Sequence, residues 1–131
     1  MKSLIVEDDY ITSQVIKEIL STFGEAEIAE NGKIAIEKFQ EAYNENDIYD
    51  VVFLDIMMPE LDGHETLSLI RQFEYKQGIM GLDAVKIIMT TALDDFDNIK
   101  SSFDNQCEGY IVKPVDKDKI ISILAEQGLI N

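Results

Sequence analysis

The sequence predicts a doubly wound α/β protein, in which helices cover both faces of a parallel sheet. Five short apolar runs alternate along the chain with segments whose apolar residues recur at helical spacing. This alternation calls for parallel strand pairing with right-handed crossovers, which places helices on both sheet faces. The chain has 131 residues, of which 46% are hydrophobic. That size and composition fit one globular domain over residues 1–131.

The first half of the chain contains two strand–helix units. Residues 4–6 form a short apolar run that predicts a buried strand. Helical spacing follows, and Gly24 is the expected stop signal; the apolar positions are Ile11, Val15, Ile16, Ile19, Leu20 and Phe23. Residues 26–29 predict a weak strand that ends before Asn31-Gly32. A second helix then has its inner face at Ile34, Ala35, Phe39, Ala42 and Tyr43.

The middle of the chain contains the strongest strand. Residues 51–54 are Val-Val-Phe-Leu, residue types that pack on both faces of a parallel sheet. Residues 58–61 predict a loop. Asp62 and Glu65 have the spacing of a capping box, and the helix that follows is marked by Leu67, Ile70 and Phe73. We expect a loop over residues 75–83, which contains Gly78 and Gly81.

The last part of the chain predicts two more strand–helix units. Residues 85–89 and 110–112 are the fourth and fifth strands. A short fourth helix between them is marked by Phe96, Ile99 and Phe103, which we interpret as core contacts. A final helix with Ile120, Ile121 and Leu124 ends near Gly128.

The charge balance excludes several classes of partner. The chain has 26 acidic and 11 basic residues, a net charge of -15. Direct binding to nucleic acid or to an anionic membrane requires a Lys/Arg surface, so neither is expected. The single Cys107 excludes an intrachain disulfide and a thiolate metal cluster. With no signal peptide and no membrane-spanning segment in the sequence, we expect a cytoplasmic protein.

The polar residues that follow the apolar runs indicate where function resides. Doubly wound folds bind ligands outside the carboxyl ends of their strands. The five expected strands are followed, in chain order, by Glu7-Asp8-Asp9, Glu30-Asn31, Asp55, Thr90-Thr91 and Lys113-Pro114. We interpret Asp9 as the cap of the first helix, because it directly precedes that helix.

These residue types suit phosphoryl transfer. Carboxylates placed close together repel and raise one another's pKa unless a cation neutralises them. Mg²⁺ fits such a site, because it takes one or two carboxylates, waters and a phosphate oxygen. With Asp55 as nucleophile, Lys113 and Thr91 supply a positive charge and a hydrogen-bond donor for the transferring phosphoryl group.

Four segments resemble the receiver domains of two-component response regulators. They are Leu4-Ile5-Val6-Glu7-Asp8-Asp9, the run from Val51 through Leu54-Asp55-Ile56-Met57-Met58-Pro59 to Asp62-Gly63, Ile87-Ile88-Met89-Thr90-Thr91-Ala92, and Gly109-Tyr110-Ile111-Val112-Lys113-Pro114. The resemblance covers Met1 to about Gly128, and the four segments in this order and spacing are very specific together. It implies a single-domain, chemotaxis-regulator-like receiver with a flavodoxin-like (βα)5 sandwich and a parallel sheet of order 2-1-3-4-5.

The resemblance also implies a metal site and a phosphoacceptor. Asp55 would accept the phosphoryl group and contribute to the metal site. Asp8 would bind Mg²⁺ directly, and Glu7 would act through metal-bound water. Met57 would contribute its backbone carbonyl. Glu7 departs from the family, because many relatives have Asp there.

Further roles are implied for the ends of the last two strands. Thr91 would hydrogen-bond one phosphoryl oxygen, and Lys113 would pair with another. The Lys113–Pro114 bond would be cis, which would aim the lysine inward. Tyr110 would be an aromatic switch that turns inward when Thr91 moves. The loop over 75–83 is longer than in compact relatives and lies on the opposite rim, so we attach no activity to it.

The implied function is a phosphorelay switch. The donor would be a sensor histidine kinase or a histidine phosphotransfer protein, and the chain would catalyse only its own phosphorylation and dephosphorylation. Phosphorylation would change the surface of helix four, strand five and helix five, at residues 94–105, Tyr110 and residues 116–127. An unidentified target protein, or a second copy in a phosphorylation-dependent dimer, would bind there. With Met57 and Leu93 beside the site, self-dephosphorylation is expected to be slow.

Three alternatives remain open. A phosphatase of the haloacid-dehalogenase type needs a second Asp two residues after the nucleophile, where this chain has Met57. A flavodoxin-like electron carrier needs a phosphate-binding first loop, which residues 7–9 would repel. A binding module that has lost phosphorylation is disfavoured by the full set of Glu7, Asp8, Asp55, Thr91 and Lys113. Met1 and the lack of a following output domain favour a stand-alone receiver over an excised one.

Overall fold

The computed structural model describes residues 1–58, 61–92 and 106–131. Five strands form one parallel sheet of order β2-β1-β3-β4-β5, which confirms the predicted fold class and strand order. The strands are β1 (Ser3–Val6), β2 (Ala26–Ala29), β3 (Val51–Asp55), β4 (Lys86–Thr91) and β5 (Gly109–Val112). The helices are α1 (Tyr10–Leu20), α2 (Gly32–Asn44), α3 (Gly63–Lys76), the 3-10 turn η1 (Gly81–Asp83) and α5 (Lys117–Glu126).

Part of the prediction falls outside the described residues. The expected fourth helix, with Phe96, Ile99 and Phe103, belongs to residues 93–105. Pro59 and Glu60 of the expected loop are also outside the described range. Within the described part of the chain, no helix is long and apolar enough to cross a bilayer.

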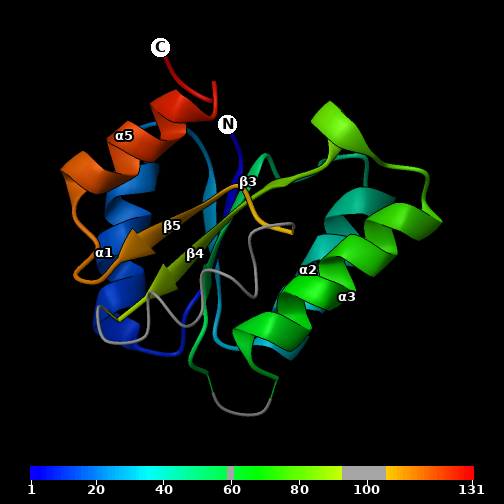
Figure 1. The fold of residues 1–131 in the computed structure, drawn as a ribbon, viewed down its shortest axis with the longest axis horizontal. Helices are drawn as coiled ribbons and strands as arrows, with labels where there is room; N and C mark the ends of the chain where they lie inside the picture. Colours follow the sequence, from blue (N-terminus) through cyan, green and yellow to red (C-terminus); the bar gives the residue numbers. More distant parts are fainter. Residues whose placement is uncertain (59–60, 93–105) are drawn as a thin grey trace.

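The helices lie in two layers, with the sheet between them. Figure 1 shows α1 and α5 on one face and α2 and α3 on the other. Successive residues of a strand point to opposite faces, so each central strand contributes to two cores. On β3, Val51 and Phe53 join the core under α1 and α5, whereas Val52 and Leu54 join the core under α2 and α3. Burial on both faces explains why the strands are almost continuously apolar.

The four α-helices in the described part of the chain begin at capping residues that the sequence provides. In each case a side-chain oxygen accepts a hydrogen bond from a backbone N–H in the first turn. The caps are Asp9 for α1, Asn31 for α2, Asp62 for α3 and Asp116 for α5. The interpretation of Asp9 as a cap is confirmed. Asp62 accepts from the Glu65 amide at 2.9 Å, as the predicted capping box requires.

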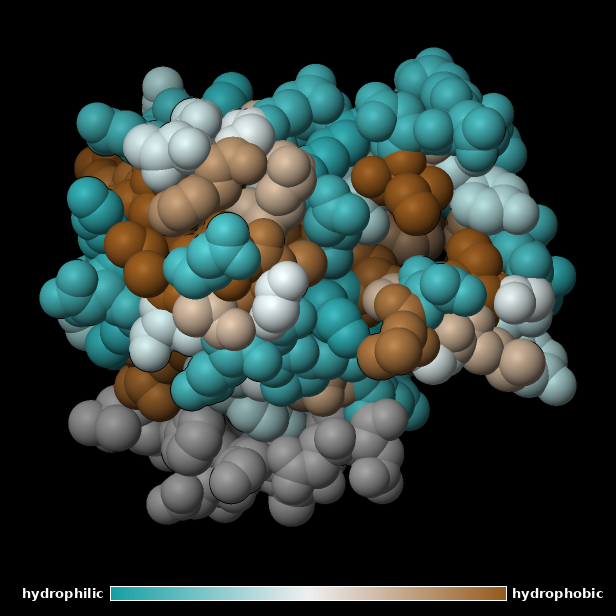
Figure 2. Space-filling view, turned by 90° about the horizontal axis from the view of Figure 1, so that it is seen from above, coloured by the Kyte–Doolittle hydropathy of each residue, from teal (hydrophilic) through white to brown (hydrophobic). Residues whose placement is uncertain are grey.

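The boundaries differ from the prediction mainly around α3. The expected loop over 75–83 begins later, because α3 continues through Tyr75 to Lys76. Gly78, with φ of 75°, provides the left-handed residue that ends this helix, and the Ile79 amide returns to the Glu74 carbonyl at 2.9 Å. The loop then exposes Met80 and Leu82. In the view from above, Figure 2 shows apolar surface on this α2–α3 side of the molecule.

We expect the Asn31 cap to contribute measurably to stability. Asn31 Oδ1 accepts from the Ile34 amide at 2.9 Å, and Asn31→Ala should lower the free energy of unfolding by about 1 kcal/mol. Asn31→Asp keeps the acceptor and should lie within a few tenths of a kcal/mol of the wild type. Urea denaturation measures both variants, and equal losses in the two would contradict the capping role.

Candidate metal centre

The strand register brings the predicted site residues to one edge of the sheet. Val6 lies opposite Leu54, so that the next residues, Glu7 and Asp55, are neighbours where β1 and β3 end. Asp55 pairs with Thr90 of β4. Backbone hydrogen bonds continue past the strand ends, from the Glu7 amide to Ala29 O at 3.1 Å among others. The backbone at this edge is therefore held by the sheet itself.

Three carboxylates meet at this edge. One carboxylate oxygen from each of Glu7, Asp8 and Asp55 lies within 4.8 Å of the other two. Glu7 and Asp55 are buried, whereas Asp8 is exposed. Glu7 Oε2 is buried and has no hydrogen-bond partner among the described residues. Because buried polar atoms are nearly always paired, this oxygen indicates room for a ligand.

Among the residues that the structure describes, Lys113 is the cation in contact with the cluster. Its Nζ lies 3.3 Å from Asp55 Oδ1 and 3.4 Å from Glu7 Oε1. Partial burial lowers the pKa of Lys113, but the charges of Asp55 and Glu7 outweigh that effect and leave the pKa raised. Lys113 therefore stays protonated at neutral pH. The Lys113–Pro114 bond is cis, as the resemblance implies.

The cluster shifts the protonation of Glu7. The pKa of Glu7 is raised from 4.5 to about 8, first because burial penalises the charged carboxylate and then because Asp55 is adjacent. Lys113 opposes this shift without cancelling it. One positive charge is thus insufficient for the carboxylates that gather here, which favours a further cation.

The donor set fits a hard divalent cation. Glu7, Asp8 and Asp55 offer only oxygen ligands, and one of these residues is exposed to solvent that can complete a coordination shell. The unpartnered Oε2 of Glu7 provides a further acceptor. These three residues could hold a metal ion.

The other predicted site residues adjoin the cluster through the backbone. The Met57 amide donates to Asp55 Oδ1 at 3.2 Å, while the Met57 side chain is 68% exposed. Thr91 is buried, its hydroxyl donates to Ala92 O at 3.3 Å, and its carbonyl accepts from the Lys113 amide at 2.7 Å. Tyr110 is partly buried and pairs with Met89 of β4. Leu93 lies outside the described residues.

Sequence reasoning assigned no role to Gly63, yet this residue positions the site. Its amide donates to Ile56 O at 3.0 Å. A Cβ on Gly63 would lie 2.6 Å from Asp55 O and 2.6 Å from the Ile56 Cα. Only glycine therefore lets α3 begin against the backbone that carries Asp55. The available signal in the sequence was a glycine in the first turn of a helix that Asp62 already caps. A glycine that capping does not require indicates a close contact with another part of the backbone.

Comparisons with known proteins place these features in one family. Residues 3–125 match the family described as the response regulator receiver domain. The chain is 32% identical to the chemotaxis protein CheY of Halobacterium salinarum, over 94% of this chain and 92% of that protein. It is also 32% identical to the osmosensing histidine protein kinase SLN1 of Saccharomyces cerevisiae, over 96% of this chain but 10% of that protein. The chain spans 7% to 12% of the length of the histidine kinases that it matches here.

One solved structure of similar fold is named as a complex with magnesium. The chain is similar to the CheX-CheY-BeF3-Mg2+ complex from Borrelia burgdorferi, at 28% identity and a TM-score of 0.78. The match covers 96% of this chain and 88% of that chain.

The raised pKa of Glu7 predicts a pH dependence of stability. The folded chain holds the Glu7 proton up to about pH 8, whereas the unfolded chain releases it near pH 4.5. The folded state therefore binds more protons in this window, and its stability falls as the pH rises through it. Glu7→Gln removes this titration, so the stability of the wild type relative to Glu7→Gln should fall from about pH 5 to about pH 8 in EDTA.

Thermal unfolding of both proteins in EDTA and in MgCl2 measures this difference. A divalent cation requires the ionised carboxylate, so MgCl2 should stabilise the wild type more at high pH than at low pH. Parallel pH profiles of the two proteins in EDTA would contradict the assignment of the titration to Glu7.

Proposed function

The chain belongs to the response regulator receiver family, and from that premise we propose that Asp55 accepts a phosphoryl group in a two-component phosphorelay, with Mg²⁺ as cofactor. The donor is a sensor histidine kinase or a histidine phosphotransfer protein in the cytoplasm. The observation that carries the proposal is the cluster of Glu7, Asp8 and Asp55 with Lys113 Nζ 3.3 Å from the Asp55 carboxylate.

The chemistry is a transfer between two side chains. A carboxylate oxygen of Asp55 attacks the phosphorus of a donor phosphohistidine, and the phosphorus–nitrogen bond breaks. The electron pair of that bond stays on the imidazole nitrogen, which takes a proton from water, while Asp55 becomes an acyl phosphate. Bound Mg²⁺ would neutralise the negative charge that the carboxylates and the phosphoryl oxygens bring together.

Each surrounding residue has a part in this transfer. Asp8 and the Met57 carbonyl would hold the ion directly, and Glu7 would hold it through water. Lys113 Nζ already lies 3.3 Å from Asp55 Oδ1 and can pair with a phosphoryl oxygen without a large movement. Thr91 would give up its contact with Ala92 O to donate to another phosphoryl oxygen.

The signal would leave through β5 and α5. The phosphoryl group adds about two negative charges, which can draw Thr91 toward the site and release space for Tyr110 on the neighbouring strand. The face that changes would include α5 (Lys117–Glu126) and residues 94–105, which are outside the described range. A target protein, or a second copy of the chain, would bind this face.

The exposed face of α1 supports a protein as the donor. Tyr10, Ile11 and Val15 are 64%, 75% and 43% exposed, although their side chains are large and apolar. The helix begins directly after Asp8 and its cap Asp9, so this apolar surface lies beside the acidic cluster. Exposed apolar patches of this kind mark interaction sites.

The position of Met57 disfavours a phosphatase that acts on external substrates. An Asp-nucleophile phosphatase needs a general acid two residues after the nucleophile, and Met57 has no ionisable group. Its exposed side chain also offers nothing that could orient an attacking water, which is consistent with slow self-dephosphorylation.

Labelling with a small phosphodonor tests the proposed function. In acetyl phosphate and MgCl2 the wild type should gain the mass of one phosphoryl group, and peptide mapping should place it on Asp55. Asp55→Asn should gain none at that peptide, because an amide is not nucleophilic enough to form the acyl phosphate. A wild type that stays unlabelled, or label that persists in the Asp55→Asn peptide, would contradict the proposal.

A second experiment separates docking from chemistry. Ile11→Ser combined with Val15→Ser should slow transfer from a phosphorylated histidine phosphotransfer domain about tenfold, because apolar anchors dominate such interfaces. Labelling by acetyl phosphate should be unchanged, since this donor needs no docking surface. Ser21→Ala, at the far end of the same helix, is the matched control. If both donors slow equally, α1 supports the site and not the partner.

A further inference from the structure

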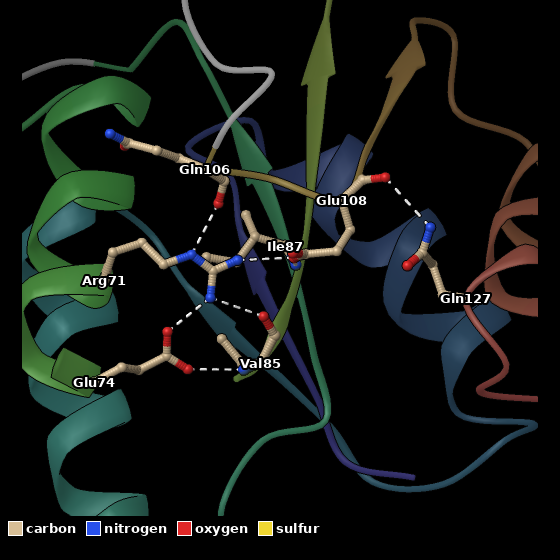
Figure 3. Close-up of polar contacts among 7 residues, drawn as sticks. All are labelled: Arg71, Glu74, Val85, Ile87, Gln106, Glu108 and Gln127. Atoms are coloured by element: carbon tan, nitrogen blue, oxygen red, sulfur yellow. Dashed lines mark hydrogen bonds and ion pairs between the residues drawn. The ribbon is translucent and has the colours of Figure 1, made fainter. Parts of the chain in front are cut away.

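A polar network joins α3 to the start of β5. It lies at the amino ends of β4 and β5, opposite the carboxyl ends where the acidic cluster is. Figure 3 shows Arg71 of α3 reaching across to β4 and to the segment before β5. Its Nε donates to Gln106 O at 2.8 Å, and one terminal nitrogen donates to Val85 O at 2.9 Å. The other terminal nitrogen pairs with Glu108 Oε1 at 2.8 Å. One guanidinium thus connects three segments.

Glu108 fixes the alignment of β5 against β4. Its amide donates to Ile87 O at 2.9 Å, and its own Oε1 accepts from the Ile87 amide at 2.7 Å. The side chain therefore supplies the hydrogen bond that a neighbouring strand would normally give at this point. The regular pairing begins with the next residues, Ile88 and Gly109.

The network also compensates a buried charge. Glu74 is buried, forms an ion pair with Arg71 at 2.7 Å and accepts the Val85 amide at 2.7 Å. A buried carboxylate that loses its counter-charge is strongly destabilising. Arg71 is therefore held in place by Glu74 on its own helix while it holds Glu108 on the other side, and the fork of its guanidinium serves both.

Helix α5 attaches at the same point. Gln127 Nε2 donates to Glu108 O at 3.3 Å. A Cβ on Gly109 would lie 2.7 Å from Ile123 Cδ1, which shows that the start of β5 packs closely on this helix. The first residues of β5 are thus tied to α3, β4 and α5 together. By contrast, Thr91 and Val112 pair at the carboxyl ends of these strands, where the acidic cluster is, and Tyr110 lies between the two ends of β5.

We propose that Arg71 and Glu108 form a fixed pivot at the amino end of the β4–β5 pair, which confines the rearrangement that follows phosphorylation to the carboxyl ends of these strands. The inference rests on the proposed function, because it concerns how phosphorylation of Asp55 is transmitted. Arg71 and Glu108 are positioning residues that act on Tyr110 through the backbone of β5.

Amide hydrogen exchange resolved by NMR tests the pivot in the full chain, with and without acetyl phosphate and MgCl2. The amides of Val85 and Ile87 report the network, since they donate to Glu74 and Glu108. In the wild type their exchange rates should agree within about twofold between the two states. The amides of Val112 and Lys113, at the carboxyl end of the pair, should change about tenfold or more.

Glu108→Gln is the decisive variant. It keeps an acceptor for the Ile87 amide but removes the ion pair with Arg71, so exchange at Ile87 should become sensitive to phosphorylation. Arg71→Lys keeps the positive charge but loses the branched guanidinium, and it should give the same pattern. If Arg71→Lys does not fold, Glu108→Gln alone still tests the proposal. Asp47→Asn removes an ion pair with Lys2 of similar length, 3.0 Å, away from β5, and should behave as the wild type.

The outcomes are distinguishable. Phosphorylation-dependent exchange at Val85 and Ile87 in the wild type would overturn the pivot, as would a Glu108→Gln variant that keeps the wild-type pattern. A merely structural role would raise exchange equally in both states and would also contradict the proposal. Mass spectrometry of each sample shows whether Asp55 is labelled, and an unlabelled wild type contradicts the proposed function itself.

Discussion

The contact of Lys113 with Glu7 and Asp55 is the interaction on which the rest of the site depends. The sheet places three carboxylates within 4.8 Å of one another, two of them buried. Left alone, such a group would repel or take up protons. Lys113 stabilises the cluster only in part, since the pKa of Glu7 remains raised to about 8. The negative charge of the carboxylates is therefore only partly compensated at the edge where we propose phosphoryl transfer.

The fold holds the site residues in position through strand pairing and close backbone contacts. Backbone pairing sets Glu7 beside Asp55, and the absence of a side chain at Gly63 lets α3 approach within contact of the Asp55 backbone. The amino end of the β4–β5 pair is tied to α3 by the ion pair between Arg71 and Glu108. Rigid support at one end and an unsatisfied charge at the other are the conditions under which a small chemical change can move a limited part of the structure.

The doubly wound fold could be predicted because its strands are buried on both faces and are therefore apolar throughout. The residues after the strands could be predicted as neighbours because parallel strands end at the same edge. Glu74 could not be recognised, because in sequence it resembles any solvent-facing helical Glu. One of its partners, the Val85 amide, comes from another segment and reaches it only in the folded chain. The extension of α3 through Tyr75 was missed for a similar reason, since an exposed residue leaves no trace in an apolar pattern.

The central claim is that the acidic cluster at the carboxyl edge is a divalent cation site. The chain offers a competitor, because a second acidic group at the amino edge includes Glu25, Glu27, Glu41, Glu45 and Asp47. Paramagnetic broadening by substoichiometric Mn²⁺, read from the backbone amides by NMR, distinguishes the two. We expect broadening first at Glu7, Asp8 and Asp55, and its loss in Asp8→Asn. Broadening that begins at the amino-edge group, or that is indifferent to Asp8→Asn, would contradict the account.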